Sequence, residues 1–540
     1  MERNLICHFS ICPLELRSLL LDFSLVILRN QTKGECVKLN LFIVFVFVLA
    51  SMNALAANDP GDILVKFKPG TMPAMGVLQE LGRVAGNFES LGENWIHVQV
   101  GAETLSVDNT ADILATLRSN PDVEYAQPNY TISLIEDYAQ NDPATRNVIE
   151  ELAAGQVAEE LLPQELFNSL FRPGPGGGTS SVGKTKPPIP AAVITPEVGA
   201  DPMLDKQWGL KAIHAPEAWK VTPGDKKVIV AVIDTGVDYT HQDLQGNIWH
   251  NPGEIPNNGI DDDGNGFVDD EIGWDFVDND NKPYDVKGSV FSTLLAGGNP
   301  GHGTHCAGDV GAVGNNSIGI SGVAPNISIM PVRFIDKTGK GTTAQAVKAI
   351  NYAVQNGAKV LSNSWGSEGE DPKENNQALK DAISNAMKHD VLFVAAAGNG
   401  RRGKGYDNDS DAKPSYPATY SYDNIVSVAA TDSKNDLAVF SNYGKKTVHV
   451  AAPGVAIYST MVGNKYSDSV FNIASVKIAW EGTSMAAPFV AGAAALIWSA
   501  HPEYKFSDVK NKLIQTSSAV PALKGKTVSG GLINLAEAVK

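Results

Sequence analysis

The sequence is poor in cysteine and has no excess of positive charge. Only four of its 540 residues are cysteines, at positions 7, 12, 36 and 306, and so few exclude a disulfide-dense scaffold. A formal net charge of −17 argues against a nucleic-acid partner, because binding to phosphates needs a basic surface. A mean hydropathy of −0.11 excludes a protein with many membrane spans. The chain does have 43% hydrophobic residues and the length of several domains, so a large buried core is expected.

Residues 1–56 are predicted to be a signal or targeting region. The apolar run LNLFIVFVFVLA at 39–50 follows two lysines and precedes Ala54-Leu55-Ala56, which fits an A-x-A cleavage site. This run is short for a transmembrane helix, so we expect secretion, with the periplasm or cell envelope as other destinations and a membrane anchor as the weaker alternative. Such a signal does not need residues 1–32, and we expect the true translation start downstream of them. Cleavage near Ala56 would leave Cys306 without a disulfide partner.

Three further segments are predicted after the signal region. Residues 57–134 alternate between strand-like and helix-like patterns in the order β-α-β-α-β, which is typical of a small ferredoxin-like α+β domain. The expected strands lie at 62–67, 94–100 and 123–133, and the expected helices begin at Pro73 and span 112–120. Residues 135–200 contain the run RPGPGGGTSSVGK, which predicts a flexible linker. In residues 201–540, apolar strand patterns alternate with amphipathic helical patterns, which predicts an α/β domain with a mostly parallel sheet covered by helices on both faces.

Four polar residues of the 201–540 domain lie in segments suited to chemistry. Asp234 ends the strand pattern VIVAVID, and His302 lies within GHGTHCAG. Asn399 follows the strand pattern VLFVAAAG, and Ser484 opens a helical pattern of small residues in GTSMAAP. Each residue alone is more often a helix cap or a turn former. Together they offer the nucleophile, the base, the group that orients the base and the amide donor that acyl transfer needs.

Two other kinds of site are compatible with the histidine-rich segment. His302 and His305 are three residues apart, as in some metal sites, but the glutamate of an H-E-x-x-H motif is absent. Cys306 and His302 could also form a cysteine–histidine nucleophile. Because Cys306 follows His302 by four residues along the expected helix, we interpret it as a small buried residue.

The segments DTGVDYTHQDL, GHGTHCAG, AAAGN and GTSMAAP, in this order, resemble the four signatures of the subtilisin-like serine proteases, the subtilases. The resemblance is clear over 201–540 and weaker over 57–134. It implies that Ser484 is the nucleophile, that His302 is the general base and that Asp234 orients His302. It also implies that Asn399 and the backbone N–H of Ser484 form an oxyanion hole.

The resemblance further implies two edges that hold an extended substrate. Ser364-Trp365-Gly366 resembles the edge that pairs with the substrate backbone, and Gly339-Lys340-Gly341 resembles the opposite edge. Ala396 and Ala397 would leave room in the wall of the S1 pocket, the pocket for the residue before the cut. An apolar preference at that position is expected.

Two structural calcium sites are expected. The segment GNNSIGI at 314–320 resembles the family's calcium loop, although an Asn-Gly turn is the alternative. The ligands that this resemblance implies are Asn316, the carbonyl groups of Gly314, Ile318 and Ile320, and the carboxylates of Asp201 and Asp243.

A second candidate calcium site comes from an acidic segment between the residues at 234 and 302. It opens like an EF-hand loop, but Ile272 stands where that loop needs a bidentate glutamate. Close carboxylates repel one another unless a cation neutralises them, so we favour calcium over a solvated acidic loop. The expected ligands are Asp261, Asp263, Asn265 and Asp269.

The 57–134 unit resembles the subtilase propeptide, which implies a folding helper that inhibits the protease until the chain cuts itself. The expected function is therefore a secreted, calcium-stabilised serine endopeptidase, made as a zymogen and acting as a monomer on proteins or peptides. Two alternatives stay open. One is an inactive subtilase-like binding protein, and the other is a calcium-dependent interaction protein of the cell envelope.

Overall fold

The computed structural model describes residues 62–70, 85–100, 107–135, 201–285, 301–368, 376–473 and 476–540, which all belong to one compact unit, Gly61–Lys540. The predicted signal region and nearly all of the predicted linker lie outside these described residues, as does the helix expected from Pro73.

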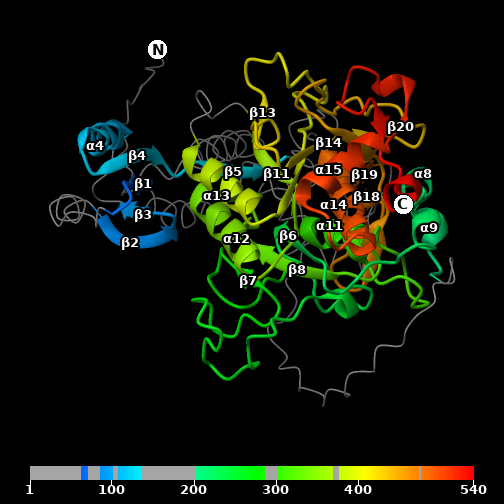
Figure 1. Cartoon of the computed structure of the whole chain (residues 1–540), viewed down its shortest axis with the longest axis horizontal. Coiled ribbons are helices and arrows are strands. Elements are labelled where there is room, and N and C mark those ends of the chain that lie inside the picture. Colours follow the sequence, from blue (N-terminus) through cyan, green and yellow to red (C-terminus); the bar gives the residue numbers. More distant parts are fainter. Residues whose placement is uncertain are drawn as a thin grey trace, which may run out of the picture. The chain divides into compact units, whose positions relative to one another are not determined.

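The small N-terminal domain is an antiparallel sheet with a helix against it (Figure 1). Its strands, in spatial order, are β2 (Ala85–Gly92), β3 (Trp95–Val100), β1 (Ile63–Phe67) and β4 (Val123–Pro128). Helix α4 (Val107–Ser119) contributes Leu114 and Leu117 to a core that they share with Val65 and other strand residues. This arrangement agrees with the expected α+β domain.

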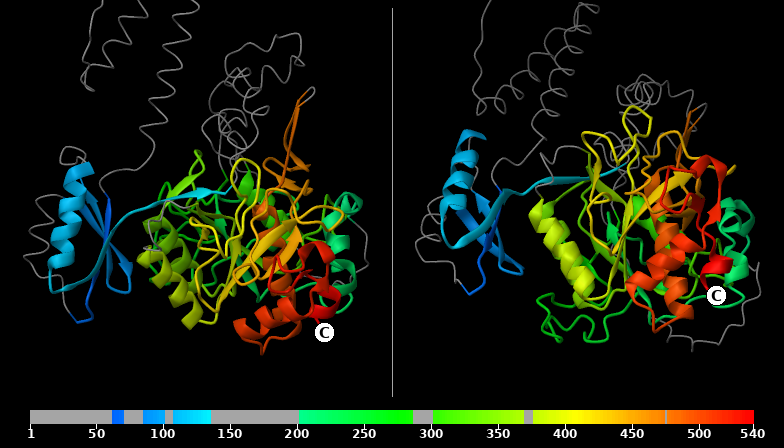
Figure 2. Two further views of the ribbon diagram at one scale, coloured as in Figure 1. Left: turned by 90° about the horizontal axis from the view of Figure 1, so that it is seen from above. Right: turned by 45° about the horizontal axis from the view of Figure 1, so that its top comes forward.

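Two details of the small domain differ from the expectation. Strand β2 has the sequence AGNFESLG, whose apolar residues do not alternate, and it forms because it pairs with β3 along its length. The strand expected at 123–133 is two strands, because the chain leaves the small sheet after Pro128. Its second part, β5 (Thr131–Leu134), joins a different sheet, which Figure 2 shows as the cyan chain reaching toward the green and yellow strands.

The large domain is built on nine strands among the described residues. In spatial order these are β20 (Ser518–Ala519), β21 (Gly531–Leu532), β15 (Val450–Pro453), β14 (Ile425–Thr431), β12 (Leu392–Ala396), β10 (Val360–Asn363), β6 (Ile229–Asp234), β8 (Ser328–Arg333) and β7 (Trp274–Asp275). Every neighbouring pair from β7 to β21 is parallel, and the edge strand β20 is antiparallel. The prediction of a mostly parallel sheet is confirmed.

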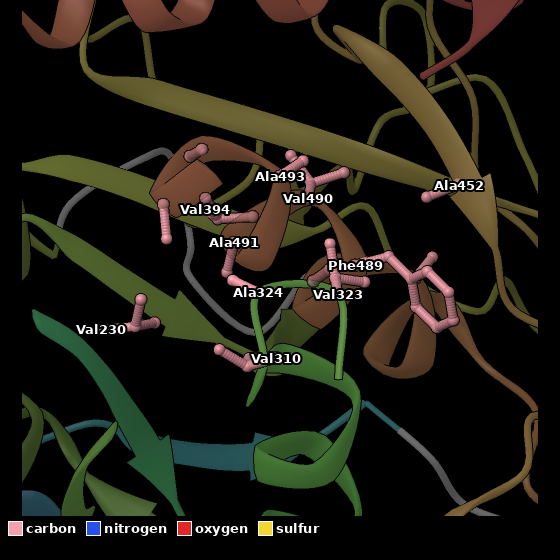
Figure 3. Packing of buried hydrophobic residues seen from close by; sticks show 14 of the residues in the cluster. Val230, Val310, Val323, Ala324, Val394, Ala452, Phe489, Val490, Ala491 and Ala493 are labelled. Atoms are coloured by element: carbon pink, nitrogen blue, oxygen red, sulfur yellow. The ribbon is translucent and has the colours of Figure 1, made fainter. Parts of the chain in front are cut away.

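Helices cover both faces of this sheet. Successive side chains of a strand point to opposite faces, and β6 divides its residues accordingly. Val230 and Val232 pack with helices α11 (His302–Gly311) and α14 (Thr483–Ala500), a core that Figure 3 shows from close by. Ala231 and Ile233 pack on the other side with helices α12 (Thr343–Gln355) and α13 (Gln377–Lys388).

Shorter elements complete the large domain. They are α8 (Trp208–Ala212), α9 (Ala215–Ala218), α15 (Phe506–Gln515), α16 (Leu535–Ala538), β9 (Lys340–Thr342), β11 (Trp365–Glu368), β13 (Ser415–Tyr416), β16 (Ser459–Met461), β17 (Lys465–Ser467), β18 (Ser469–Ile473), β19 (Val476–Ala479) and the 3₁₀ turns Leu204–Lys206, Gln245–Asn247 and Pro521–Leu523.

Helix α14 is the one described helix with the length and apolar composition of a membrane span, and 89% of that segment is buried inside the domain. Its residues Ala486, Gly492 and Ala493 are small, which lets neighbouring backbone approach closely. A Cβ at Gly492 would lie only 2.7 Å from the Val323 side chain. The helix therefore serves as the centre of the core.

Candidate active site

Asp234 and His302 meet where a central strand ends and a helix begins. Asp234 is the last residue of β6, and His302 is the first residue of α11. The Nδ1 atom of His302 lies 2.7 Å from Oδ1 of Asp234, and both side chains are buried. Gly303 makes this approach possible, because a Cβ there would collide with the carbonyl oxygen of Gly236. An Nδ1–H that donates to the carboxylate leaves Nε2 as the basic nitrogen of a neutral imidazole.

Ser484 lies in the first turn of helix α14. Its carbonyl oxygen accepts a hydrogen bond of 2.9 Å from the hydroxyl of Ser364, and its own hydroxyl lies 3.3 Å from the Ser364 carbonyl. The Ser484 carbonyl is available because its helical partner would be the N–H of residue 488, which is proline. Ser484 is thus held against the segment that begins at Ser364.

Cys306 lies between the histidine and the serine. Its Sγ atom is 3.9 Å from His302 Nδ1 and 3.6 Å from the Ser484 carbonyl oxygen, so both residues contact one sulfur atom. Burial raises the pKa of the Cys306 thiol to about 12, so the thiol stays protonated and non-nucleophilic at neutral pH. The interpretation of Cys306 as a small buried residue is confirmed.

His305 does not join His302 in a metal site. Its Nε2 atom lies 3.0 Å from the carbonyl oxygen of Ile457, and its Nδ1 atom lies 3.2 Å from Asp309. Its ring stacks on Trp480. The Nε2 contact and the stacking on Trp480 hold the His305 ring against Ile457 and Trp480, and the cluster of potential ligand atoms around His302 contains Asp234 and Cys306 rather than His305.

Asn399 follows strand β12 and is held by the helix that carries Ser484. Its Oδ1 atom accepts hydrogen bonds of 2.8 Å from the Thr483 N–H and 2.9 Å from the Thr483 hydroxyl. Because Oδ1 is fixed in this way, the orientation of the amide is set and its Nδ2 donor points away from Thr483. The N–H of Ser484 belongs to the first helical turn, where N–H groups have no partner within the helix. The sequence gives no signal for the positioning role of Thr483.

The two predicted substrate edges lie on either side of strand β5. Leu134 and Ser133 pair antiparallel with Trp365 and Gly366 of β11. On the opposite side, β5 pairs antiparallel with β9, with Ile132 facing Gly341, and the Leu134 N–H donates to the Gly339 carbonyl at 2.9 Å. The tail of the small domain therefore lies as a strand between the edges expected to hold a substrate.

The two alanines predicted in the S1 wall have different surroundings. Ala396 belongs to the large core cluster against which Ile135 packs. Ala397 packs in a separate cluster with Ala429 and Val448. The difference follows from the alternation of side chains along and just beyond β12.

The small domain contacts the N-termini of α12 and α13. The Oε1 atom of Gln127 accepts a hydrogen bond from the Ala378 N–H at 3.1 Å, in the first turn of α13. Asn129 Oδ1 accepts one from the Ala344 N–H at 2.9 Å, in the first turn of α12. These groups satisfy helix N–H groups that lack partners within the helix. An ion pair of 2.7 Å between Lys66 and Asp381 adds to the same interface.

The first predicted calcium loop brings two buried carboxylates together at Asn316. Asp201 accepts hydrogen bonds from the backbone N–H groups of Asn315 and Asn316, at 2.8 and 3.0 Å. Asp243 accepts one from Asn316 Nδ2 at 2.7 Å and one from the Ile320 N–H at 2.8 Å. Burial raises the pKa of Asp243 to about 6, and the nearby Asp201 carboxylate adds to the rise. Gly314 and Ile318, whose carbonyls are also predicted ligands, lie in the same loop, where the Ile318 N–H donates to Asn316 Oδ1.

The acidic segment gathers a different set of carboxylates from the expected one. Ligand atoms of Glu254, Asp263 and Asp270 all lie within 4.8 Å of one another. Asp263 is one of the expected ligands. Glu254 is not, because it precedes the acidic run and its spacing from the other carboxylates matches no metal-binding motif. Glu254 Oε2 is buried and has no hydrogen-bond partner among the described residues, and burial raises the pKa of Asp270.

The other expected ligands of this segment have different contacts. The Asp261 carboxylate accepts hydrogen bonds from the backbone of Asn265 and Gly266. The Asp269 carboxylate accepts them from the N–H groups of Asn258 and Gly259, both at 2.9 Å. Asn265 donates through Nδ2 to Asp263 and Asp270, at 3.1 Å each. Asp261 and Asp269 therefore stabilise turns around the three-carboxylate cluster.

Known proteins share the segments that form this site. Residues 225–531 match the profile of the Subtilase family. The chain is 38% identical to thermitase from Thermoactinomyces vulgaris over 294 residues, which are 54% of this chain and 82% of thermitase. It is 32% identical to a thermophilic serine proteinase from Bacillus sp. (strain AK1) over 441 residues, 81% of this chain and 78% of that protein. It is 34% identical to subtilisin-like protease 2 of Plasmodium falciparum (isolate 3D7) over 341 residues, 62% of this chain but 22% of that protein.

Proposed function

This chain belongs to the subtilase family and is a serine-type endopeptidase, and from that premise we propose that it is a secreted, self-processing zymogen stabilised by calcium. The observation that carries the zymogen proposal is the position of β5. A strand of the chain's own N-terminal domain pairs with both β9 and β11, so a protein substrate must displace it before it can enter.

In the proposed mechanism, Ser484, His302 and Asp234 act as a triad. The Ser484 hydroxyl attacks the substrate carbonyl carbon while His302 Nε2 takes the hydroxyl proton. Asp234, 2.7 Å from His302 Nδ1, holds the ring in the required tautomer and stabilises the imidazolium. His302 then gives the proton to the leaving amine, and water releases the acyl group by the same steps in reverse.

Asn399 and the backbone N–H of Ser484 are proposed to stabilise the oxyanion. Support comes from the two hydrogen bonds that fix Asn399 Oδ1 on Thr483, because a donor that is already oriented needs no reorganisation when the charge develops. Residues 1–56 are proposed to direct secretion, on the pattern of their sequence.

Calcium is proposed to bind at two places. One is the Asp201–Asp243 pair at the 314–320 loop. The other is the cluster of Glu254, Asp263 and Asp270, where a buried carboxylate oxygen without a hydrogen-bond partner fits a divalent cation. Oxygen donors of this kind are the ligands that Ca²⁺ prefers, and the bound ion would neutralise carboxylates that otherwise repel one another.

The function is tested by hydrolysis of an unfolded protein with the purified, self-processed chain, in calcium and in chelator. We expect hydrolysis that a serine-directed covalent inhibitor abolishes. Calcium at about 100 times its Kd contributes about 2.7 kcal/mol at each site, which is roughly 4 °C of Tm for a domain of about 340 residues. We therefore expect removal of calcium from both sites to lower the Tm by roughly 8 °C and to speed autolysis. Glu254→Gln should lose part of the calcium-dependent rise in Tm.

Asp262→Asn is the matched control for that variant. Asp262 lies in the same loop, but its carboxylate accepts hydrogen bonds from the Ile255 N–H and Asn258 Nδ2 outside the cluster. Its calcium-dependent rise in Tm should equal that of the wild type. The acidic segment is not a calcium site if Glu254→Gln keeps the full calcium-dependent rise in Tm. The same conclusion follows if the two variants lose equal parts of that rise.

A further inference from the structure

We propose that Asp285 is a positioning residue for the reaction. Its carboxylate caps helix α11 and so holds His302 against Asp234, and its charge favours the imidazolium that forms during catalysis. The proposal rests on the roles proposed above for His302 and Asp234 and adds a residue that acts through them. Asp285 belongs to none of the four sequence segments that carry the resemblance to subtilases, and it comes from the geometry alone.

The backbone at Asp285 lies directly against the loop that follows Asp234. Gly236 in that loop has a φ of +103°, and a Cβ there would lie 2.6 Å from the Tyr284 carbonyl oxygen and 2.9 Å from the Asp285 nitrogen. Only glycine permits both this conformation and this approach. The two backbones therefore bring Asp285 beside Thr235, the residue after Asp234, and the Asp285 side chain is completely buried there.

Helix α11 begins without a capping side chain of its own. Its N-cap residue is Gly301, so the first N–H groups of the helix depend on acceptors from elsewhere in the chain. The Thr304 N–H donates to Oδ2 of Asp285 at 2.9 Å, and the Thr304 hydroxyl donates to the same oxygen at 2.5 Å. The Gly303 N–H donates to the Thr235 hydroxyl oxygen at 3.0 Å. Asp285 and Thr235 therefore supply the missing cap.

The second oxygen of Asp285 links this cap to the strand that ends at Asp234. The Thr235 hydroxyl donates to Oδ1 of Asp285 at 2.9 Å, and the Thr235 N–H donates to Oδ1 of Asp234 at 2.7 Å. That Asp234 oxygen is the one that lies 2.7 Å from Nδ1 of His302. One buried carboxylate thus joins the residue after Asp234 to the helix turn that begins at His302. These partners of Asp285 all donate, which suits an ionised carboxylate.

The charge of Asp285 opposes an effect of the helix on the general base. His302 is the first residue of α11, where the positive end of the helix dipole disfavours an imidazolium. A carboxylate at the same helix end offsets that effect. The other ionisable side chains near the imidazole are Asp234 on β6 and Cys306, His305 and Asp309 on α11. Replacing Asp285 leaves all of these side chains in the enzyme, so a change in the behaviour of His302 reports on Asp285.

The test is the pH dependence of peptide hydrolysis by the self-processed Asp285→Asn enzyme, from about pH 5 to about pH 9. The variant keeps the whole triad, so it still processes itself when given more time. We expect kcat to fall by about 10- to 100-fold with KM within about twofold of the wild type, because alignment is lost but no substrate contact is. The acid limb of the profile should move to lower pH by about half a unit, since loss of a nearby anion lowers the pKa of His302.

Three further comparisons separate positioning from a general loss of stability. In an Asp234→Asn background, Asp285→Asn should slow self-cleavage by less than about threefold, because the alignment that Asp285 maintains is no longer used. Thr235→Val, which breaks the link to Asp285, should slow hydrolysis at least about tenfold, whereas Thr235→Ser keeps the hydroxyl and should stay within about threefold of the wild type. Asp432→Asn is the control for charge alone, because Asp432 accepts hydrogen bonds from the N–H groups of Lys434 and Asp436 in a turn after β14. It should leave the pH profile unchanged.

The outcomes separate this proposal from the one beneath it. Wild-type rates in Asp285→Asn, or equal rates in Thr235→Val and Thr235→Ser, would overturn the positioning role, and so would fully additive effects with Asp234→Asn. An acid limb that does not move in Asp285→Asn would overturn the role of the charge. All of these results leave the proposed triad intact. Failure of the wild type to hydrolyse peptides, or hydrolysis by Ser484→Ala, would overturn both proposals.

Discussion

Replacing Ser484 with alanine is expected to lower the rate of self-processing about 10⁶-fold, to the point that the full chain stays uncut for days. The hydroxyl is the atom that forms the covalent bond, so no neighbouring group replaces it. Cys306 is the nearest alternative nucleophile, but its thiol has a pKa near 12 and its sulfur faces the Ser484 carbonyl rather than the cleft. The measurement is the fraction of intact chain over time, by gel or mass spectrometry.

Loss of processing keeps the inhibitory strand in place, so hydrolysis of an added substrate needs a separate measurement. Trace wild-type enzyme can cut the Ser484→Ala chain in trans and release its small domain, after which the variant should still fail to hydrolyse a peptide. Ser499→Ala is the matched control on the same helix, where the Ser499 hydroxyl donates to Ala495. It should process at nearly the wild-type rate, and a comparable loss there would point to misfolding instead of chemistry.

Replacing Asp234 with asparagine is expected to lower the rate of processing about 10⁴-fold. The amide has nearly the same shape, so the fold should persist. However, a neutral amide does not stabilise the imidazolium, and an amide N–H toward His302 favours the tautomer with the proton on Nε2, which cannot act as a base. The single-turnover rate of self-cleavage measures this directly, because the substrate strand is already bound.

Asp238→Asn provides the control for Asp234→Asn. Asp238 is equally buried and lies near the same loop, but its carboxylate accepts hydrogen bonds from Thr240 and the Gly463 N–H. An asparagine can keep the acceptor for Thr240, so the rate should fall by less than about tenfold. Equal rates in Asp234→Asn and Asp238→Asn would refute the role assigned to Asp234.

The sequence predicted the large fold because its signals are local and repeated. Strand patterns such as VIVAVID are apolar on both faces, which occurs in sheets covered on both sides, and the confirmed parallel order follows from the helical patterns between them. The sequence also placed Asp234 and His302 at element ends that prove to lie within hydrogen-bond distance.

Other features were outside the reach of sequence patterns because they depend on distant partners. Strand β2 has no apolar alternation and is held by β3. The division of 123–133 into two strands depends on where β9 and β11 offer free edges, more than 200 positions later. Glu254 lies close to Asp263 and Asp270 because of the way the loop folds. The sequence spacing between Glu254 and Asp263 does not predict this contact. Thr483, in α14, orients Asn399, which follows β12, and the two residues are far apart in the sequence.

The central claim is that Ser484 is a nucleophile activated by His302, and the most direct measurement is the location of a covalent fluorophosphonate adduct on the self-processed enzyme. The account predicts one adduct, on the peptide that contains Ser484. It also predicts labelling at least about 10³-fold slower in His302→Ala after its small domain has been removed in trans. An adduct on a different serine, or equal labelling of Ser484 without His302, would contradict the account.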